Sequence, residues 1–294
     1  MTSDPISTLW AGRFDSAPDP AAFDFGISFG VDRALFEDDV VGSLAWADAL
    51  HAAGVLSQQD TAAIVTALTE ILDRGRREPA WISGPDEDVH SFVERQLVER
   101  VGDAGRRLHT GRSRNEQVSL DLRLYLRRRI PLLQQAVVDV VDACATQAER
   151  AGSALMPSYT HFRRAQPVLV AHFFLSHAAA LRRDAARLAA GSAEADALTL
   201  GSRAIAGTSY AIDTALLARR LGFSRVVLNS MDASSDRDFV ASFLYASSLA
   251  MVHLSRLAED VIIFTGEEHG FFELADASAT GSSMMPQKKN PDPL

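Results

Sequence analysis

The sequence feature that most constrains the fold is a long apolar stripe in residues 118–148. Its members recur at steps of three or four residues, the spacing that puts side chains on one face of an α-helix. They are Val118, Leu122, Leu126, Ile130, Leu133, Val137, Val141, Cys144 and Ala148. The stripe spans roughly eight turns, and Pro131 within it predicts a kink or a break near Ile130. A helix of this length with one apolar face needs other long helices to cover that face.

A second stripe predicts another long helix over residues 239–264. Its apolar positions also follow at steps of three and four: Phe239, Phe243, Ala246, Ala250, Leu254, Leu257, Val261 and Phe264. Ser234 and Ser235 can cap this helix. Asp236 and Asp238 place negative charge in its first turn, where the helix dipole favours it.

A third long helix is expected at residues 166–190, with Pro167 at its first position. Its apolar face includes Val170, Phe173, His177, Leu181 and Leu188. No segment shows the alternating pattern of a sheet, and only short hairpins near residues 199–210 and 223–229 fit the sequence. The predicted fold class is all-α, with a bundle of long helices.

The region before the first long stripe has a different pattern. Shorter helical patterns occur at residues 34–53, 57–74 and 88–101, separated by Gly, Pro and polar residues. We therefore predict an N-terminal helical domain at residues 1–110, followed by a central long-helix bundle at residues 111–294.

Composition narrows the class of protein and the partners it can have. The 294 residues are 47% apolar and 23% charged, which is typical of a globular chain. The net charge of −9 offers no whole-chain attraction to nucleic acid or to a membrane surface, so neither is expected as a partner. A single cysteine, Cys144, excludes an intramolecular disulfide and a cysteine-based zinc site. Residues 1–5 lack the features of a signal peptide, and we expect a cytoplasmic protein.

Three polar clusters lie at the predicted ends of the long helices. Residues 110–115 bring two guanidinium groups, two hydroxyls and an amide to a helix N-terminus, which favours an anion; a solvated turn capped by Ser113 or Asn115 is the alternative. Residues 158–161 contain a histidine that could transfer protons near neutral pH, although a loop histidine is more often a surface residue. Residues 281–291 contain one Gly, two Ser and two Lys, and could form a loop that holds an oxyanion or a merely flexible loop.

The order of residues in these clusters is similar to that of a known family. The segment GSSMMPQKKNP at 281–291 matches the GSSxMPxKxNP signature of the fumarase/aspartase superfamily. Within that superfamily, TGRSRNEQV at 110–118 and YTHFRRAQP at 159–167 resemble the argininosuccinate lyases, whose relatives include the delta crystallins. LWAGRF at 9–14, DEDVHSFVE at 86–94 and NSMDASSDRDF at 229–239 are also similar. The resemblance covers nearly the whole chain, with Glu116 where the family usually has Asp.

The resemblance implies a fold, an assembly and a reaction. The family has the fumarase/aspartase type of helical bundle and forms a homotetramer, in which three signature regions from three different subunits meet at each active site. Its members eliminate fumarate from argininosuccinate and release arginine, in arginine biosynthesis, with no metal and no organic cofactor. Family members continue beyond the position of Leu294, completing the bundle and adding a C-terminal domain. We therefore expect the 294-residue chain alone to bind and cleave argininosuccinate weakly.

The resemblance also implies roles for individual residues. Ser282 is the base that removes a proton from carbon, and Lys288 and Asn290 face the negative charge that develops. His161 is the acid, or the group that positions it. The implied substrate-binding residues are Ser28, Arg114, Asn115, Thr160 and His90.

Two other functions are compatible with the sequence. Another fumarate-releasing lyase, such as adenylosuccinate lyase, would share the signature loop and differ in the pocket around the leaving nitrogen. A non-catalytic homologue, crystallin-like or truncated, would keep the fold without turnover. The presence of Ser282, His161, Lys288 and Asn290 argues against decay of the site.

Overall fold

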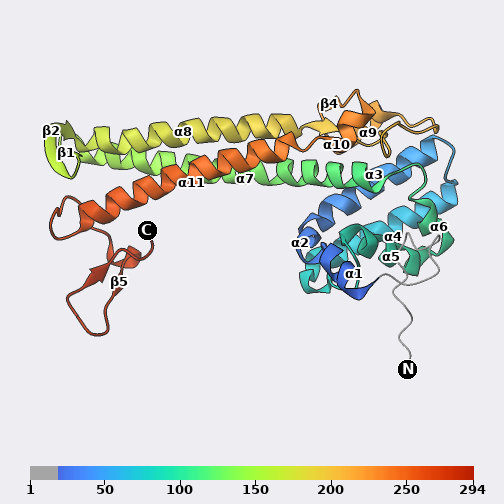
Figure 1. Cartoon of the computed structure of the whole chain (residues 1–294), viewed down its shortest axis with the longest axis horizontal. Coiled ribbons are helices and arrows are strands. Elements are labelled where there is room, and N and C mark those ends of the chain that lie inside the picture. The colour runs from blue at the N-terminus through green and yellow to red at the C-terminus, as the bar shows by residue number, and fades with distance from the viewer. Residues whose placement is uncertain (1–18) are drawn as a thin grey trace. The chain divides into compact units, whose positions relative to one another are not determined.

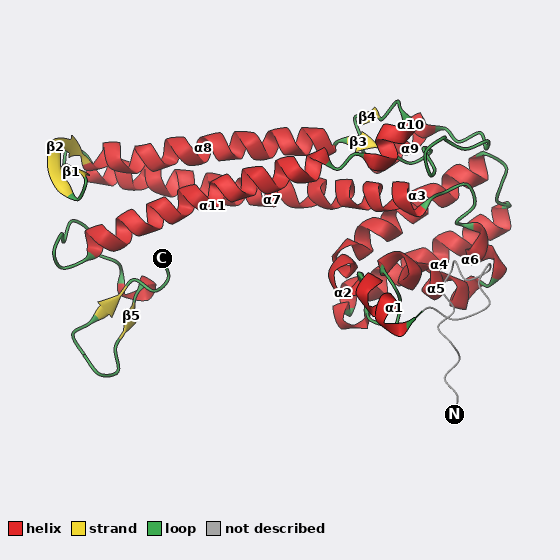
Figure 2. Cartoon of the chain, viewed as in Figure 1, coloured by secondary structure: helices red, strands yellow, loops and turns green. Residues whose placement is uncertain are grey.

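Helices make up most of the described part of the chain, residues 19–294 of a computed structural model (Figure 1, Figure 2). The all-α prediction is confirmed, and the strands that occur are short. The LWAGRF segment and the start of the predicted N-terminal domain lie outside the described residues. Among residues 19–294, no helix combines the length and the apolar character needed to cross a membrane.

The chain divides into two compact units. Unit 1 takes residues up to 128 together with 194–238, and unit 2 takes residues 129–193 and 239–294. The longest helix, α7 (Arg114–Ala151), contributes its first part to unit 1 and the rest to unit 2. The domain boundary expected near residue 110 stays a prediction.

Unit 1 is built mainly from short helices around one apolar core. Its elements are α1 (Pro20–Gly26), α2 (Phe29–Asp32), α3 (Phe36–Ala52), α4 (Gln58–Arg77), α5 (Val89–Val101), α6 (Asp103–Arg107), the start of α7, β3 (Ala197–Leu198), α9 (Thr214–Leu221), β4 (Arg225–Val226) and α10 (Ser230–Ser235). Two 3₁₀ turns, Arg33–Leu35 and Pro79–Trp81, complete the unit. Trp46, Leu68 and Phe92 are fully buried in its core. The three helices expected between residues 34 and 101 are therefore confirmed.

Unit 2 contains the long helices and two small hairpins. Its elements are the rest of α7, β1 (Leu155–Thr160), β2 (Arg163–Leu169), α8 (Val170–Ala195), α11 (Asp238–Thr265), a 3₁₀ turn (Asp276–Ser278), β5 (Thr280–Gly281) and β6 (Lys289–Asn290). The helices α8 and α11 run beside each other (Figure 1). They are joined by a contact in which Oδ2 of the buried Asp184 on α8 lies 2.6 Å from Nδ1 of the half-buried His253 on α11.

The predicted stripes are confirmed as helices, but some of their ends differ from the prediction. The helix α7 continues through Pro131, so the break expected near Ile130 does not occur. In α11 the predicted serine caps are wrong, because Ser234 and Ser235 belong to the separate helix α10. The side chain of Asp236 instead accepts a hydrogen bond from the amide of Asp238 at 2.8 Å.

The third helix starts later than the proline signal predicts. Pro167 lies in strand β2, and α8 begins only at Val170. The strands β1 and β2 pair antiparallel, and this hairpin explains the difference because its pairing extends to Leu155 and Leu169. The hairpins expected near residues 199–210 and 223–229 are also wrong, since β3 and β4 form a parallel pair.

Candidate active site

The turn that carries Arg114 and Asn115 is fixed by reciprocal capping. Ser113 immediately precedes α7, and its Oγ accepts a hydrogen bond from the Asn115 amide at 3.4 Å. Glu116 Oε1 reaches back and accepts one from the Ser113 amide at 3.0 Å. This is the capping-box arrangement, in which two otherwise unpaired N–H groups of a helix end are satisfied. Ser113 is thus the cap, while Arg114 is half-buried and Asn115 is exposed.

The same glutamate connects this turn to a second loop of unit 1. Glu116 is fully buried, and its Oε2 accepts hydrogen bonds from the amides of Gly201 at 2.8 Å and Arg203 at 2.9 Å. The Ser202 hydroxyl lies 3.3 Å from the same oxygen. Gly201 and Arg203 both have positive φ, of 102° and 55°. Such a backbone conformation is unfavourable for an arginine, and the hydrogen bonds to Glu116 help to hold the loop in it. One carboxylate therefore fixes both the turn and the loop.

Three segments that are distant in sequence meet around Arg114. Arg114 Nη1 donates to Asp88 Oδ1 at 2.6 Å, and Asp88 is also the N-cap of α5. Asp32 Oδ1 accepts a hydrogen bond from the amide of Val89 at 3.0 Å, and Ser28 Oγ lies 2.5 Å from the other oxygen of Asp32. The structure thus brings the predicted binding residues Ser28, Arg114 and Asn115 into one region of unit 1.

Two ionisable residues of this region were not singled out from the sequence. Glu94 is half-buried, and burial raises the pKa of its carboxyl although Arg114 and Arg112 oppose the shift. Burial, reinforced by the charges of Arg112 and Arg114, lowers the pKa of His109 to about 4. The available signals were the i, i+4 spacing of His90 and Glu94 on one helix face and the position of His109 next to the TGRSRN segment.

The low pKa of His109 predicts a pH-dependent stability of unit 1. An unfolded histidine titrates near 6.5, so the neutral ring favours the folded state above that pH and this contribution is lost as the pH falls toward 4. We expect the free energy of unfolding of the parent chain to fall by about 2 kcal/mol between pH 7 and pH 4.5 because of His109. The His109→Gln variant should not show this contribution. Urea unfolding of both chains at the two pH values, followed by tryptophan fluorescence, measures this difference. Parallel losses in the two chains would contradict it.

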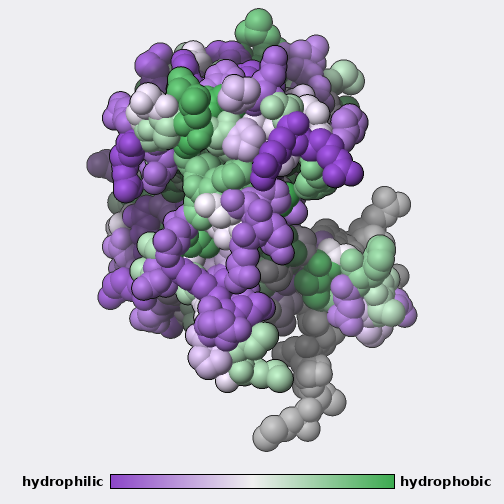
Figure 3. All heavy atoms as spheres, turned by 90° about the vertical axis from the view of Figure 1, so that its left-hand side faces the viewer, coloured by the Kyte–Doolittle hydropathy of each residue, from purple (hydrophilic) through white to green (hydrophobic). Residues whose placement is uncertain are grey.

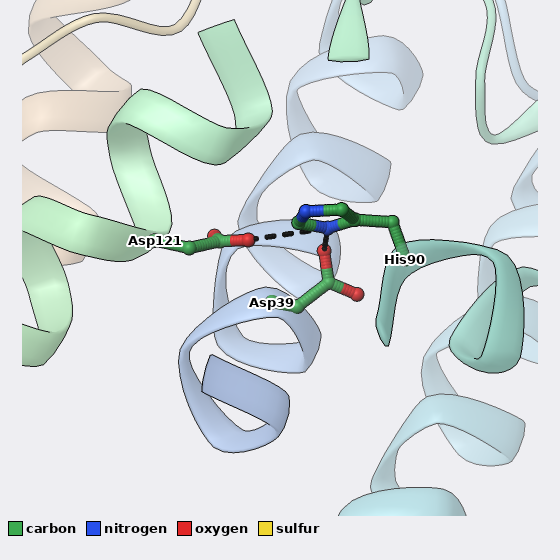
Figure 4. Close-up of side chains that lie close together, drawn as sticks. All are labelled: Asp39, His90 and Asp121. Atoms are coloured by element: carbon green, nitrogen blue, oxygen red, sulfur yellow. Dashed lines mark hydrogen bonds and ion pairs between the residues drawn. The ribbon is translucent and has the colours of Figure 1, made fainter. Parts of the chain in front are cut away.

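His90 differs from the other predicted binding residues because it is buried. Only 4% of the residue is exposed, and its Nδ1 lies 2.8 Å from Asp39 Oδ1 and 3.4 Å from Asp121 Oδ2 (Figure 4). Asp39 comes from α3, His90 from α5 and Asp121 from α7. These three residues also form the one group of possible metal ligands found among residues 19–294. The predicted contact of His90 with the substrate stays a prediction.

Thr160 and His161 lie at the tip of the β1–β2 hairpin. Thr160 pairs with Arg163, and the two residues between them, His161 and Phe162, have φ of 53° and 54°. Positive φ at both central positions is the geometry of a two-residue hairpin turn that matches the strand twist. Thr160, His161 and Phe162 are all exposed at this end of unit 2, where apolar surface lies between hydrophilic patches (Figure 3). The polar loop expected here is therefore a hairpin.

The hairpin tip lies over the end of α11. Tyr159 packs against Phe264 and His269, with ring centroids 5.8 Å and 5.4 Å apart. A pocket of about 340 Å³ is lined by Tyr159, His161, Phe162, Glu259, Asp260, Ile263, Phe264 and His269. The carboxylates of Glu259 and Asp260 thus share this pocket with the imidazole of His161.

The signature loop is closed by the strand pair β5–β6. Gly281 pairs with Lys289, and Thr280 pairs with Asn290. Inside the loop, Ser282 Oγ accepts hydrogen bonds from the amides of Met284 at 3.3 Å and Met285 at 3.1 Å. Lys288 is exposed and Asn290 half-buried. The loop therefore surrounds the Ser282 hydroxyl with N–H donors.

The nine predicted residues fall into separate groups. Ser28, Arg114 and Asn115 form one group in unit 1, with His90 buried in the same unit. Unit 2 holds the hairpin tip and the signature loop. Within the described part of unit 2, no hydrogen bond or ion pair connects Thr160 or His161 with Ser282, Lys288 or Asn290.

Comparison with known families decides the classification. The profile of the family described as "Lyase" matches residues 12–294. The chain belongs to this lyase family. The bundle of this lyase also resembles the solved structure of EDDS lyase in complex with formate, with a TM-score of 0.81 and 26% sequence identity. That likeness covers 94% of this chain and 55% of the other, and it confirms the helical fold.

Curated relatives of the lyase carry a more specific name. The argininosuccinate lyase of Roseiflexus castenholzii is 48% identical over 284 residues, which cover 97% of this chain and 62% of that protein. The argininosuccinate lyase of Caldanaerobacter subterraneus subsp. tengcongensis is 45% identical and is covered to 64%. The chain therefore spans less than two thirds of the length of these relatives.

Proposed function

We propose that this lyase chain acts as an argininosuccinate lyase, cleaving argininosuccinate to arginine and fumarate. The observation that carries the proposal is the identity of 45–48% with argininosuccinate lyases over 97% of the chain, a span that includes the TGRSRN turn, the hairpin tip and the signature loop. The activity is expected to need no metal or organic cofactor and to serve arginine biosynthesis in the cytoplasm.

Unit 2 would supply the groups that move protons. The reaction removes a proton from the carbon beside a substrate carboxylate, and the bond from the neighbouring carbon to the guanidinium nitrogen then breaks. Ser282 would take the proton, since the two loop amides on its Oγ can stabilise an alkoxide. Lys288 and Asn290 would face the dianionic carboxylate that forms. His161 would protonate the departing nitrogen or position its acid, and Thr160 would bind a carboxylate.

Unit 1 would hold the substrate. Arg114 and Asn115 stand at the N-terminus of α7, where a carboxylate gains from the helix dipole and from free N–H groups. Asp88 holds Nη1 of Arg114, and Nη2 makes a longer contact of 3.5 Å with the Ser91 hydroxyl. The guanidinium is thus fixed, and its remaining N–H groups would bind the ligand. Ser28 stands nearby as an exposed hydroxyl.

We propose that complete sites form in a homotetramer from groups on different subunits. The long helices have apolar side chains available for such contacts: Leu132, Leu133, Leu175, Leu244, Tyr245, Met251 and Val252 are each at least 43% exposed. Clusters of exposed apolar side chains on helices are typical of protein interfaces.

The exposed helix faces predict self-association of the 294-residue chain. We expect light scattering at micromolar concentration to give a mass above that of a monomer, because burying these faces removes apolar surface from water. Leu244→Lys with Met251→Lys should shift the mass downward, while the helical circular dichroism stays unchanged. A well-folded parent monomer would contradict the prediction.

A comparison of two substrates tests the proposed reaction. Fumarate absorbance is recorded with argininosuccinate and, separately, with adenylosuccinate, using the chain at the same concentration. We expect fumarate only from argininosuccinate. Release from adenylosuccinate alone would identify another fumarate-releasing lyase, and release from neither substrate would favour the non-catalytic homologue.

A further inference from the structure

A buried charged cluster in unit 1 contains two carboxylates, Asp39 and Asp121, to which the proposed chemistry gives no role. Asp39, His90 and Asp121 come from three helices and point toward one another (Figure 4). Asp39 is 1% exposed and Asp121 fully buried, so bulk solvent does not reach their oxygens. Asp39 Oδ2 and both oxygens of Asp121 have no hydrogen-bond partner. A buried carboxylate without donors is unfavourable, and this cluster therefore needs a further proton, water or cation.

The donors around the cluster are unevenly distributed. Asp39 Oδ1 accepts from Gln117 Nε2 and faces His90 Nδ1 at 2.8 Å, so the imidazole must donate there. An Nδ1 that carries a proton cannot bind a metal ion. The buried Arg112 guanidinium, which donates to Ser43 Oγ, lines a cavity of about 10 Å³ with Asp39 and His90. Positive charge is thus already present beside Asp39, which disfavours a divalent cation.

We propose that Asp121 is a neutral carboxylic acid that donates its proton to Asp39, and that the cluster positions the turn carrying Arg114 and Asn115. Asp39 has two donors and keeps its charge, whereas Asp121 has none and keeps the proton. A proton between the two carboxyl groups provides a partner on each side.

The electrostatics of the surrounding groups agree with this assignment. Burial raises the pKa of Asp121, and the charge of Asp39 raises it further, more than Arg112 lowers it. Burial opposes ionisation of Asp39, yet the charge and hydrogen bond of His90 keep the pKa of Asp39 low. The ionisable groups that act on the three residues are Asp32, Asp38, Glu94, His109 and Arg112, and Glu116 acts in turn on Arg112.

The cluster is linked to the predicted binding turn through two of its three helices, α5 and α7. Gln117, which Asp39 holds, lies three residues after Arg114 in α7. His90 lies two residues after Asp88, the carboxylate that binds Arg114. Asp39 thus ties the first turns of α5 and α7 together beneath the Asp88–Arg114 pair. That the positioned turn binds substrate rests on the proposed function. The protonation of Asp121 does not rest on it.

A matched pair of variants tests the proton on Asp121. Asp121→Asn keeps a neutral donor of the same shape, while Asp121→Leu removes the donor. We expect Asp121→Asn to melt within about 2 °C of the parent at pH 4, where an unfolded aspartate is also largely protonated, and Asp121→Leu to melt lower by about 5 °C or more. A raised folded-state pKa stabilises the protein at low pH, and this contribution is lost as the pH rises. Because an unfolded aspartate titrates near pH 4, the parent should lose stability relative to Asp121→Asn as the pH rises from about 4.

The positioning role is read from amide hydrogen exchange. We expect Asp121→Leu to speed exchange of the residue 114–117 amides at least tenfold, with unit 2 amides as the internal control. Equal destabilisation by both variants at every pH would overturn the proposal. A stoichiometric metal ion in the purified chain, with stability lost on chelation, would also overturn it. Unchanged exchange at residues 114–117 in Asp121→Leu would refute positioning. Failure to cleave argininosuccinate affects none of these readouts.

Discussion

Replacement of Ser282 by alanine is expected to lower kcat for argininosuccinate by about 10²–10⁴-fold, with KM nearly unchanged. The hydroxyl would act mainly in the transition state, where it takes the proton. Two loop amides, of Met284 and Met285, already donate to its Oγ, which is what an alkoxide base requires. The alanine removes the base and leaves the β5–β6 pairing in place. Both kcat and KM are measured from fumarate absorbance, with a preparation of the assembled chain that is active on argininosuccinate.

Arg114→Ala is the matched control for this experiment. Its guanidinium belongs to the substrate-holding turn of unit 1, so the variant should raise KM more than it lowers kcat. Near-normal turnover by Ser282→Ala would eliminate Ser282 as the base. The opposite pattern, in which Ser282→Ala changes only KM, would assign the serine to binding.

Loss of the Glu116 carboxylate is expected to cost about 3–5 kcal/mol of unfolding free energy in unit 1. Glu116→Ala would leave the amides of Ser113, Gly201 and Arg203 without the acceptor they now share. Glu116→Gln keeps an acceptor oxygen and should cost less. Glu116→Asp is one methylene shorter and should fall between them, because it cannot reach both the turn and the loop without a shift.

The tryptophans make this measurement specific to unit 1. Trp46 and Trp81 both lie in unit 1, and no tryptophan occurs in unit 2. Urea unfolding followed by their fluorescence therefore reports on the unit that contains Glu116. Glu70→Ala, on the exposed face of α4, is the control and should change stability by less than about 0.5 kcal/mol. A Glu116→Ala chain as stable as this control would refute the bridging role.

The helical framework could be predicted from residue spacing, whereas several helix ends could not. Local rules placed Pro167 at a helix start, yet Pro167 became part of strand β2 because the antiparallel pairing with β1 extends to Leu169. Local rules also predicted a kink or a break at Pro131, and α7 continues through this residue without a break. In both cases the tertiary context outweighed a single-residue preference.

The site was predictable only where it consists of contiguous segments. The TGRSRN turn, the hairpin tip and the signature loop could each be found from residue order, because each is a local structure at the end of an element. The interactions of Asp88, Glu94 and His109 with the turn could not, since each of these residues lies outside α7 and the Asp88–Arg114 contact spans 26 positions.

By itself, the sequence determined the fold class, the long helices and the three polar segments that carry the resemblance to a lyase family. Those features depend on interactions between near neighbours, whose geometry the helical period sets. Only the tertiary structure decided that Glu116 bridges to residues 201–203 and that His90 is buried between Asp39 and Asp121. Such contacts arise from packing between elements, which also removes the water that would otherwise screen their charges and satisfy their hydrogen bonds.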